Sequence, residues 1–391
     1  MKKKTIFALG LIVIFALPAF GQSEPYESYY LYLGDYPHGA SPGWHEDVQG
    51  LTHDENYWYI TQSDADDSNK AERSLWKIPV EHDLAKSATP GVNGVERVII
   101  DDIPELAGQG YNHWGDLDYY QYEGVGYLFL PMEGGKGNTG MAVLRADNLQ
   151  YIDHYEFALK YSAWCAVDHE GFLYFSEDFF DVPRILKYYP HYENIKDTGS
   201  LDLTIHPHMD LYDENGVGLT VHRVQGGTFS EYGRYIYLVS NTDGIHVFDT
   251  QTGSRVQKST NGHGYFNYQF DETGWGGYEE PEGITFWDLD DDPRVPEDTI
   301  SGQLHVFLLD NEAGADEIIF KHYTHTIYVD GAYSGTEMGR PDKPFNTVSE
   351  ANSLAWDEAK IKIQAGSYPE SLTFSKRIEV LAIDGTVTIG E

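Results

Sequence analysis

The chain has 391 residues, a formal net charge of -37 and a single cysteine, Cys165. Such an acidic surface repels nucleic acid and anionic membranes and attracts metal ions. Aromatic residues make up 14% of the sequence, which is too many for a disordered acidic chain and is typical of β-rich or sugar-binding proteins. One cysteine cannot form an intrachain disulfide, so we expect Cys165 to be a small buried residue of an inner strand.

The first residues have the pattern of an export signal. A basic start at Lys2, Lys3 and Lys4 precedes an apolar run over residues 6–20, which is short for a membrane span. Small residues before Gln22 favour cleavage there, so residues 1–21 are predicted to be a signal peptide; an uncleaved anchor is the alternative. No later segment is apolar enough to span a bilayer. We therefore expect a bacterial protein that is secreted, periplasmic or held at the cell surface.

A short motif, in which a polar residue and a glycine precede an apolar strand, recurs at intervals of roughly 40–50 residues. This spacing is typical of propeller blades. The copies contain Gly50, Gly115, Gly226 and Gly283, and a weaker copy without the glycine surrounds Trp164. Capped helical patterns are almost absent before residue 324. The sequence therefore predicts an all-β protein with a five-bladed β-propeller over residues 22–325. Six blades are the alternative if residues 22–46 pair with the end of the propeller to close the ring, and a β-sandwich would need no repeat.

The segment from Thr326 changes character. A Tyr328-Val329-Asp330 strand is followed by Pro344-Phe345-Asn346-Thr347, a predicted short helix over 348–359, and a second strand that ends in Gly366-Ser367-Tyr368-Pro369-Glu370. In this order the motifs resemble the cap and first coils of right-handed parallel β-helix proteins of the pectin-lyase-like superfold. The resemblance covers residues 326–391 and implies an incomplete right-handed β-helix domain after the propeller.

Residues just before each innermost strand of a propeller meet at one mouth of the central channel. Convergence of polar groups at a concave mouth is the usual geometry of a binding site. The glycines of the repeated motif have a structural explanation, since a residue without a side chain lets the strands approach one another closely at the axis. The side chains expected at this mouth are His45, Glu46, Asp47, His113, Asp116, Trp164, His222, Arg223, Glu279, Glu280 and Glu282.

Three interpretations of this mouth remain open. In the first, it binds calcium through the carboxylates of Asp47, Asp116 and Glu282. In the second, it performs acid–base chemistry on a sugar through His113, His222 and Arg223 with a nearby tyrosine. Histidine exchanges protons near neutral pH and arginine neutralises a uronate carboxylate, while Asp116 and Glu282 would alternatively form a glycosidase pair. In the third, these groups bond to one another and to water in a filled channel.

Aromatic rings stack on the apolar faces of sugars, and the rings placed to do so are those of Trp164, Tyr265 and Trp275. The sequence thus favours a carbohydrate-associated protein that binds or processes extracellular polysaccharide. As an enzyme it would be a polysaccharide lyase or a glycoside hydrolase. The expected partner is an extracellular glycan, with no nucleic acid and no membrane span after signal cleavage. The alternative is a non-enzymatic adhesion or protein-interaction module with a structural, calcium-stabilised propeller.

Overall fold

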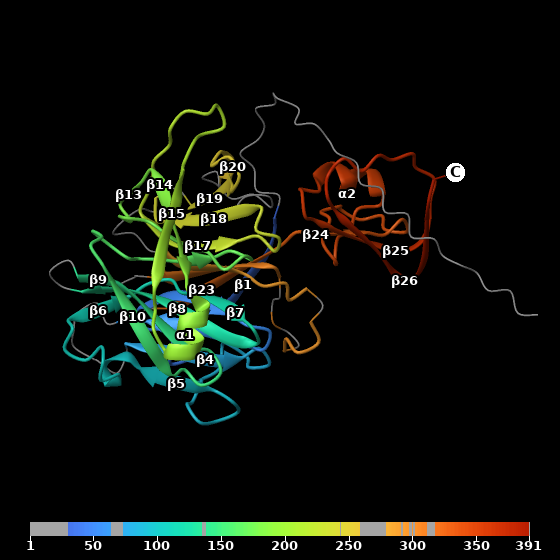
Figure 1. The fold of residues 1–391 in the computed structure, drawn as a ribbon. Helices are drawn as coiled ribbons and strands as arrows, with labels where there is room; N and C mark the ends of the chain where they lie inside the picture. Colours follow the sequence, from blue (N-terminus) through green and yellow to red (C-terminus); the bar gives the residue numbers. More distant parts are fainter. Residues whose placement is uncertain are drawn as a thin grey trace, which may run out of the picture.

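The chain folds into a five-bladed β-propeller followed by a smaller unit with a parallel sheet (Figure 1). In the described part of the chain, no helix is long and apolar enough to cross a membrane. The signal-peptide residues 1–21, together with Tyr265 and Trp275, lie outside the described residues. The computed structural model describes residues 30–63, 73–134, 138–242, 244–258, 279–290, 292–296, 299, 302–310 and 317–390.

Each blade is an antiparallel sheet. Its first strand in the chain is innermost in blades one, three and four, two strands share the inner position in blade two, and blade five takes its outermost strand from the start of the chain. Blade one contains β2 (Val48–His53), β3 (Tyr57–Gln62), β4 (Ser74–Pro79) and β5 (Glu96–Ile99). Blade two contains β6 (Tyr111–Trp114) and β7 (Asp118–Tyr122), which both pair with β8 (Val125–Gly134), then β9 (Asn138–Arg145) and β10 (Tyr151–Phe157). Blade three contains β11 (Ala166–Val167), β12 (Leu173–Phe175), β14 (Arg184–Pro190) and β15 (Leu203–Asp210).

Blade four contains β17 (Val224–Phe229), β18 (Tyr235–Ser240), β19 (Gly244–Asp249) and β20 (Arg255–Lys258). Blade five contains β21 (Glu279–Phe286), β22 (Leu304–Asp310), β23 (Glu317–Thr324) and, as its outermost strand, β1 (Leu31–Ala40). The innermost strands contact one another around a closed ring in the order β2, β7, β11, β17, β21 and back to β2. The predicted propeller of five blades is therefore confirmed. The N-terminal strand closes the ring as part of blade five and forms no sixth blade.

Shorter elements join the blades. A two-stranded sheet of β13 (Asp181–Val182) and β16 (Val221–His222) ties the loops of blades three and four together. The connection over residues 190–222 contains the short helix α1 (Tyr192–Thr198) before the outermost strand of blade three, β15. A 3-10 turn, η1 (Ile100–Asp102), follows β5. These elements add to the blades without changing their number.

Five hydrophobic clusters hold the ring together, one between each pair of neighbouring blades. Fully burying a large apolar side chain contributes about 1.5–3 kcal/mol, so packing between the blades is a main source of stability. Cys165 is buried in the cluster between blades two and three, as expected for an inner strand. Representative members from the two blades of each cluster are Trp58 and Phe320, Leu75 and Leu128, Phe129 and Phe175, Ile185 and Phe248, and Val247 and Val306.

The C-terminal unit has its own core around a parallel sheet of β24 (Thr326–Val329), β25 (Lys360–Tyr368) and β26 (Glu379–Ile389). The strands pair in register, so that Ile327, Ile361 and Val380 stand side by side. Helix α2 (Val348–Leu354) covers this sheet, and the hydroxyl of its N-cap residue, Thr347, accepts the backbone N–H of Glu350. Three parallel strands agree with the predicted start of a β-helix, which stays a prediction.

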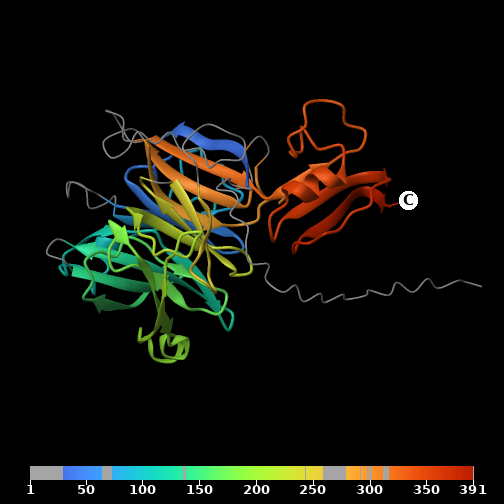
Figure 2. The same ribbon diagram turned by 90° about the horizontal axis from the view of Figure 1, so that it is seen from above.

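The C-terminal unit stands to one side of the propeller (Figure 2). At the junction, Nε2 of His325 accepts the backbone N–H of Trp356 at 3.1 Å, and the ring of Trp356 lies 5.8 Å from that of Tyr235. An ion pair between Lys360 and Asp288 links β25 to blade five. The two units therefore share polar and aromatic contacts as well as a chain connection.

Candidate functional site

The axis of the propeller is occupied by the carboxylate of Asp116. Its Oδ1 accepts the backbone N–H of Leu51 at 3.0 Å, and its Oδ2 accepts those of Gly227 at 3.1 Å and Ile284 at 3.5 Å. A side chain at Gly50 would collide with the backbone of Asp116, which explains the glycine there. The carboxylate thus fastens blades one, four and five to blade two.

This arrangement does not fit the predicted roles of Asp116 as a calcium ligand or as half of a glycosidase pair. Both of its oxygens are used by backbone donors, and the side chain is fully buried. Burial raises its pKa well above the ordinary value, against the opposing effect of the backbone hydrogen bonds. In the described part of the chain, no three histidine, cysteine or acidic side chains are placed to hold a metal ion. Asp116 is a structural carboxyl.

We call the face where the innermost strands begin the front face, and the opposite one the rear face. On the front face, Glu282 is 4% exposed, and Nε2 of Gln225 donates to its carboxyl oxygens at 3.2 and 3.3 Å. The same nitrogen lies 3.3 Å from Glu280, which also accepts from Asn241. Burial, then the charges of Glu280 and Asp47, raise the pKa of Glu282 well above its ordinary value. The charge of Asp47 therefore acts on the carboxyl of Glu282.

A second buried carboxyl, Glu133 on β8, lies opposite His113 in the strand pairing of blade two. Burial raises the pKa of Glu133 to about 7, while the backbone N–H of Ser162, 2.5 Å from its Oε1, opposes the shift. Burial lowers the pKa of His113 to about 4, so this imidazole is neutral at pH 7. The His113 side chain is partly exposed, and its Nδ1 has no hydrogen-bond partner among the described residues, so no carboxylate orients it.

His222 and Arg223 enter the front face from the start of blade four. Nδ1 of His222 lies 2.8 Å from Oδ1 of Asp181, and both side chains are more than half exposed. The described residues provide no partner for Nε2 of His222. The backbone N–H of Arg223 donates to the carbonyl of Phe180, and its guanidinium lies 5.8 Å from the ring of that residue. The carboxylate thus orients an imidazole whose outer nitrogen faces solvent.

Asp181 also lines a cavity of about 390 Å³, the front pocket. Two cations face it, and each pairs with an acid of the pocket: Lys160 with Asp178 at 2.6 Å, and Arg184 with Glu177 at 2.9 Å. The size falls in the range typical of ligand pockets. The remaining lining residues are Ala158, Leu159, Ser176, Val182 and Pro183.

The structure brings some predicted site residues together and separates others. His222 and Arg223 are consecutive, and His222 contacts Asp181 of the front pocket. Trp164, by contrast, is 0% exposed, and its Nε1–H donates to Ser176 at 3.0 Å. The Trp164 ring is therefore part of the core and offers no face for a sugar. Sequence reasoning missed Asp181, because nothing in a single sequence pairs residues of different blades. It missed Glu133 because the raised pKa of that carboxyl depends on burial.

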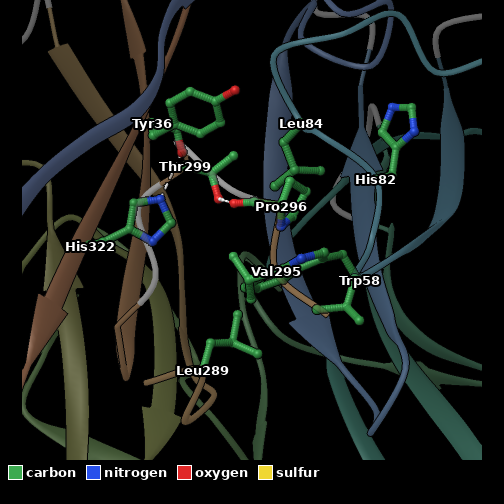
Figure 3. A pocket seen from close by; sticks show the side chains of 10 residues that line it. Tyr36, Trp58, His82, Leu84, Leu289, Val295, Pro296, Thr299 and His322 are labelled. Atoms are coloured by element: carbon green, nitrogen blue, oxygen red, sulfur yellow. Dashed lines mark hydrogen bonds between the residues drawn. The ribbon is translucent and has the colours of Figure 1, made fainter. Parts of the chain in front are cut away.

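A small cavity lies between β1 and blades five and one (Figure 3). Its volume of about 30 Å³ is close to that of one water molecule. Tyr36, Trp58 and Leu289 line it, and Nε2 of His322 lies 2.7 Å from the backbone oxygen of Tyr36. The cavity is too small for a sugar. It is a packing gap where β1 meets blades five and one.

Comparison with known proteins assigns no family. No family profile matches the sequence, and no curated protein matches it. Solved structures with a similar fold include a glutaminyl cyclase from Myxococcus xanthus, with 11% identity over 75% of this chain and 96% of that one, and a TM-score of 0.43. A GH43_1 enzyme from Xanthomonas citri has 14% identity over 72% and 88%, with a TM-score of 0.42.

A third similar structure is the tail fibre of Staphylococcus aureus phage P68, with 14% identity over 75% of this chain and 52% of that one, and a TM-score of 0.39. The names of the three proteins describe different functions: a cyclase, a GH43_1 enzyme and a phage tail fibre. At such identities and TM-scores, the likeness assigns no activity to this chain.

Proposed function

We propose that this chain is an exported, carbohydrate-associated protein that binds and processes an acidic polysaccharide at the front pocket. The observation that carries the proposal is the pair of His222 and Asp181, 2.8 Å apart beside a cavity of about 390 Å³. A carboxylate that accepts Nδ1–H leaves Nε2 as a proton acceptor, which is the arrangement of a general base. Arg223 follows in the chain and supplies a positive charge close to this base.

In the proposed reaction, Nε2 of His222 removes the proton from the carbon next to a uronate carboxylate. The electron pair of that C–H bond forms a carbon–carbon double bond, and the glycosidic C–O bond on the neighbouring carbon breaks. The leaving oxygen takes a proton from a general acid, for which we propose Tyr161. The ring of Tyr161 lies 4.9 Å from that of Phe179 and 5.3 Å from that of Phe180, in the loop that carries Asp181.

The cations of the front pocket suit an acidic substrate. Lys160 and Arg184 are 61% and 40% exposed, and each pairs with an acid of the protein. Exposed ion pairs contribute only about 0–1 kcal/mol, so a substrate carboxylate can replace the protein's own partner. Neutralising the uronate carboxylate would make the proton beside it more acidic, which is the effect the reaction needs.

One observation favours binding without turnover. The same two cations are already neutralised by Asp178 and Glu177, and the axis of the propeller is closed by Asp116. In this second candidate function the propeller is a scaffold for adhesion or protein interaction. It predicts that glycans or proteins bind the front face and leave it unchanged.

Three further expectations belong to the proposal. The in-register parallel strands β24, β25 and β26 support a right-handed β-helix that begins at Thr326. The basic and apolar start of the chain supports export. Asp47 and Glu282 remain the carboxyls that would attract calcium, and a melting temperature that falls on chelation would support its binding.

A panel of acidic and neutral polysaccharides tests the proposed function. Elimination produces an unsaturated uronate that absorbs in the ultraviolet, whereas hydrolysis produces reducing ends without this absorbance. We expect absorbance to rise with at least one uronate-containing polysaccharide. Binding without either product would favour the second candidate function, a propeller that only binds. Reducing ends without ultraviolet absorbance would indicate hydrolysis, catalysed by a carboxyl such as Glu282.

A further inference from the structure

The rear face holds a second cavity, the rear pocket, with a volume of about 330 Å³. Residues at or near the ends of all five innermost strands line it. It lies on the side of Asp116 opposite to the front pocket. The residues that matter are Thr52, Asp118, Val167, Thr228 and Thr285, one from each blade. The propeller therefore offers a concave site on its axis that the proposed reaction does not use.

Four of these residues repeat the symmetry of the axis. Thr52, Thr228 and Thr285 each come two residues after an axis glycine, and Asp118 comes two residues after Asp116. They therefore form a polar layer directly behind the Asp116 carboxylate. Asp118 is satisfied within this layer, because it accepts the Thr52 hydroxyl at 2.8 Å and the Val167 backbone N–H at 2.6 Å.

Thr228 and Thr285 differ from Thr52 in one respect. Their side chains are buried, with relative exposures of 6% and 2%, yet neither hydroxyl has a hydrogen-bond partner among the described residues. Neither oxygen is among the buried polar atoms that lack a partner, so both hydroxyls are open to the cavity and available to donate to and accept from a ligand there. Two such hydroxyls from neighbouring blades line the same cavity. This arrangement suits a ligand that supplies hydrogen-bonding groups there.

The charges of the rear pocket restrict the ligand. Neither lysine nor arginine occurs among its lining residues, which include the acids Asp118, Asp168 and Glu231. Anions are therefore repelled, in contrast to the front pocket. Rings of Tyr119 and Phe286 also line the cavity and suit the apolar C–H faces of a sugar.

We propose that the rear pocket binds an uncharged sugar of about monosaccharide size. The hydroxyls of Thr228 and Thr285 both donate and accept hydrogen bonds, which matches the hydroxyl groups of such a ligand. The cavity volume lies at the small end of the range for ligand sites. This site is independent of the proposed reaction, since its residues, its face and its charge preference all differ from those of the front pocket.

The test measures binding of D-glucose, D-galactose, D-xylose and D-glucuronate to the full chain by calorimetry. We expect saturable binding of at least one neutral sugar, and at least tenfold weaker binding of D-glucuronate. The double variant Thr228→Val, Thr285→Val keeps the side-chain shape without the hydroxyls. Loss of two hydrogen bonds predicts affinity at least about tenfold weaker. The Thr228→Ser, Thr285→Ser variant keeps both hydroxyls and should bind within about threefold of the parent.

Two controls separate the outcomes. His222→Ala changes the front pocket alone and should leave neutral-sugar binding intact. Melting curves show whether each variant folds, and the two single valine variants carry the test if the double variant does not. The proposal is overturned if no neutral sugar saturates the protein, if folded valine variants bind as tightly as the parent, or if His222→Ala abolishes binding.

Discussion

Nδ1 of His222 lies 2.8 Å from a carboxylate oxygen of Asp181, although 41 residues separate them in the chain. The short sheet of β13 and β16 produces this contact, because it pairs Asp181 directly with His222. One residue belongs to a loop of blade three and the other to the start of blade four. The proposed site is therefore a product of the contact between two blades.

Asp181→Asn should lower kcat on the acidic polysaccharide by about 10- to 100-fold while changing KM little, because an amide no longer fixes the proton on Nδ1 of His222. Steady-state kinetics check this. Asp210→Asn is a matched control, since Asp210 pairs with His208 at 3.2 Å outside the front pocket. Equal losses in both variants would contradict a specific role of Asp181.

Asp116→Ala should destabilise the propeller severely, by roughly 3 kcal/mol or more. The backbone N–H groups of Leu51 and Gly227 would lose their acceptor in a buried setting, and each unsatisfied donor costs about 1–3 kcal/mol. Denaturant unfolding of the variant against Asp197→Ala, at an exposed position, measures this. A loss no larger than that of the control would show that the axial carboxylate does not fasten the blades.

Glu133→Gln should make stability less sensitive to pH. Burial raises the pKa of Glu133 from the ordinary 4.5 to about 7, so the folded state holds this proton more tightly than the unfolded chain. The resulting stabilisation is complete below pH 4.5 and disappears as pH rises through 7, with a size on the order of 3 kcal/mol. Unfolding free energies at pH 5 and pH 8 should therefore favour the variant more at pH 8. A difference independent of pH would exclude the raised pKa.

Removing residues 1–40 should lower the melting temperature strongly compared with removing residues 1–29. The longer deletion removes β1, which pairs with β23 as the outermost strand of blade five, and it removes the ion pair of Asp35 with Lys321 at 3.1 Å. The edge of β23 would then lose its backbone partners. Circular dichroism on heating compares the two deletions, and matching transitions would refute closure of the ring by β1.

Much of the propeller could be predicted from the repeated motif around Gly50, Gly226 and Gly283. These glycines are required because the blades approach one another closely at the axis. Their spacing in the sequence therefore predicts the arrangement of the blades around that axis. The N-terminal strand was harder to place, since its pairing with β23 joins the two ends of the propeller. A single sequence contains no local trace of that pairing.

The site was predicted only in part. His222 and Arg223 lie at the start of blade four, where its innermost strand begins, and their role in a site stays a prediction. Trp164 was expected at a binding surface, but its ring packs between blades three and four. The role of Asp181 depends on a contact between blades, and the raised pKa of Glu133 depends on burial. Both are tertiary properties that neither motif nor spacing reports.

The most direct test of the account is the rate at which unsaturated uronate forms from an acidic polysaccharide, compared for the parent protein, His222→Ala and His208→Ala. We predict turnover by the parent, a rate at least about 100-fold lower for His222→Ala with an unchanged melting temperature, and a rate within about twofold of the parent for His208→Ala. No product with any uronate polysaccharide, or an undiminished rate in His222→Ala, would contradict the account.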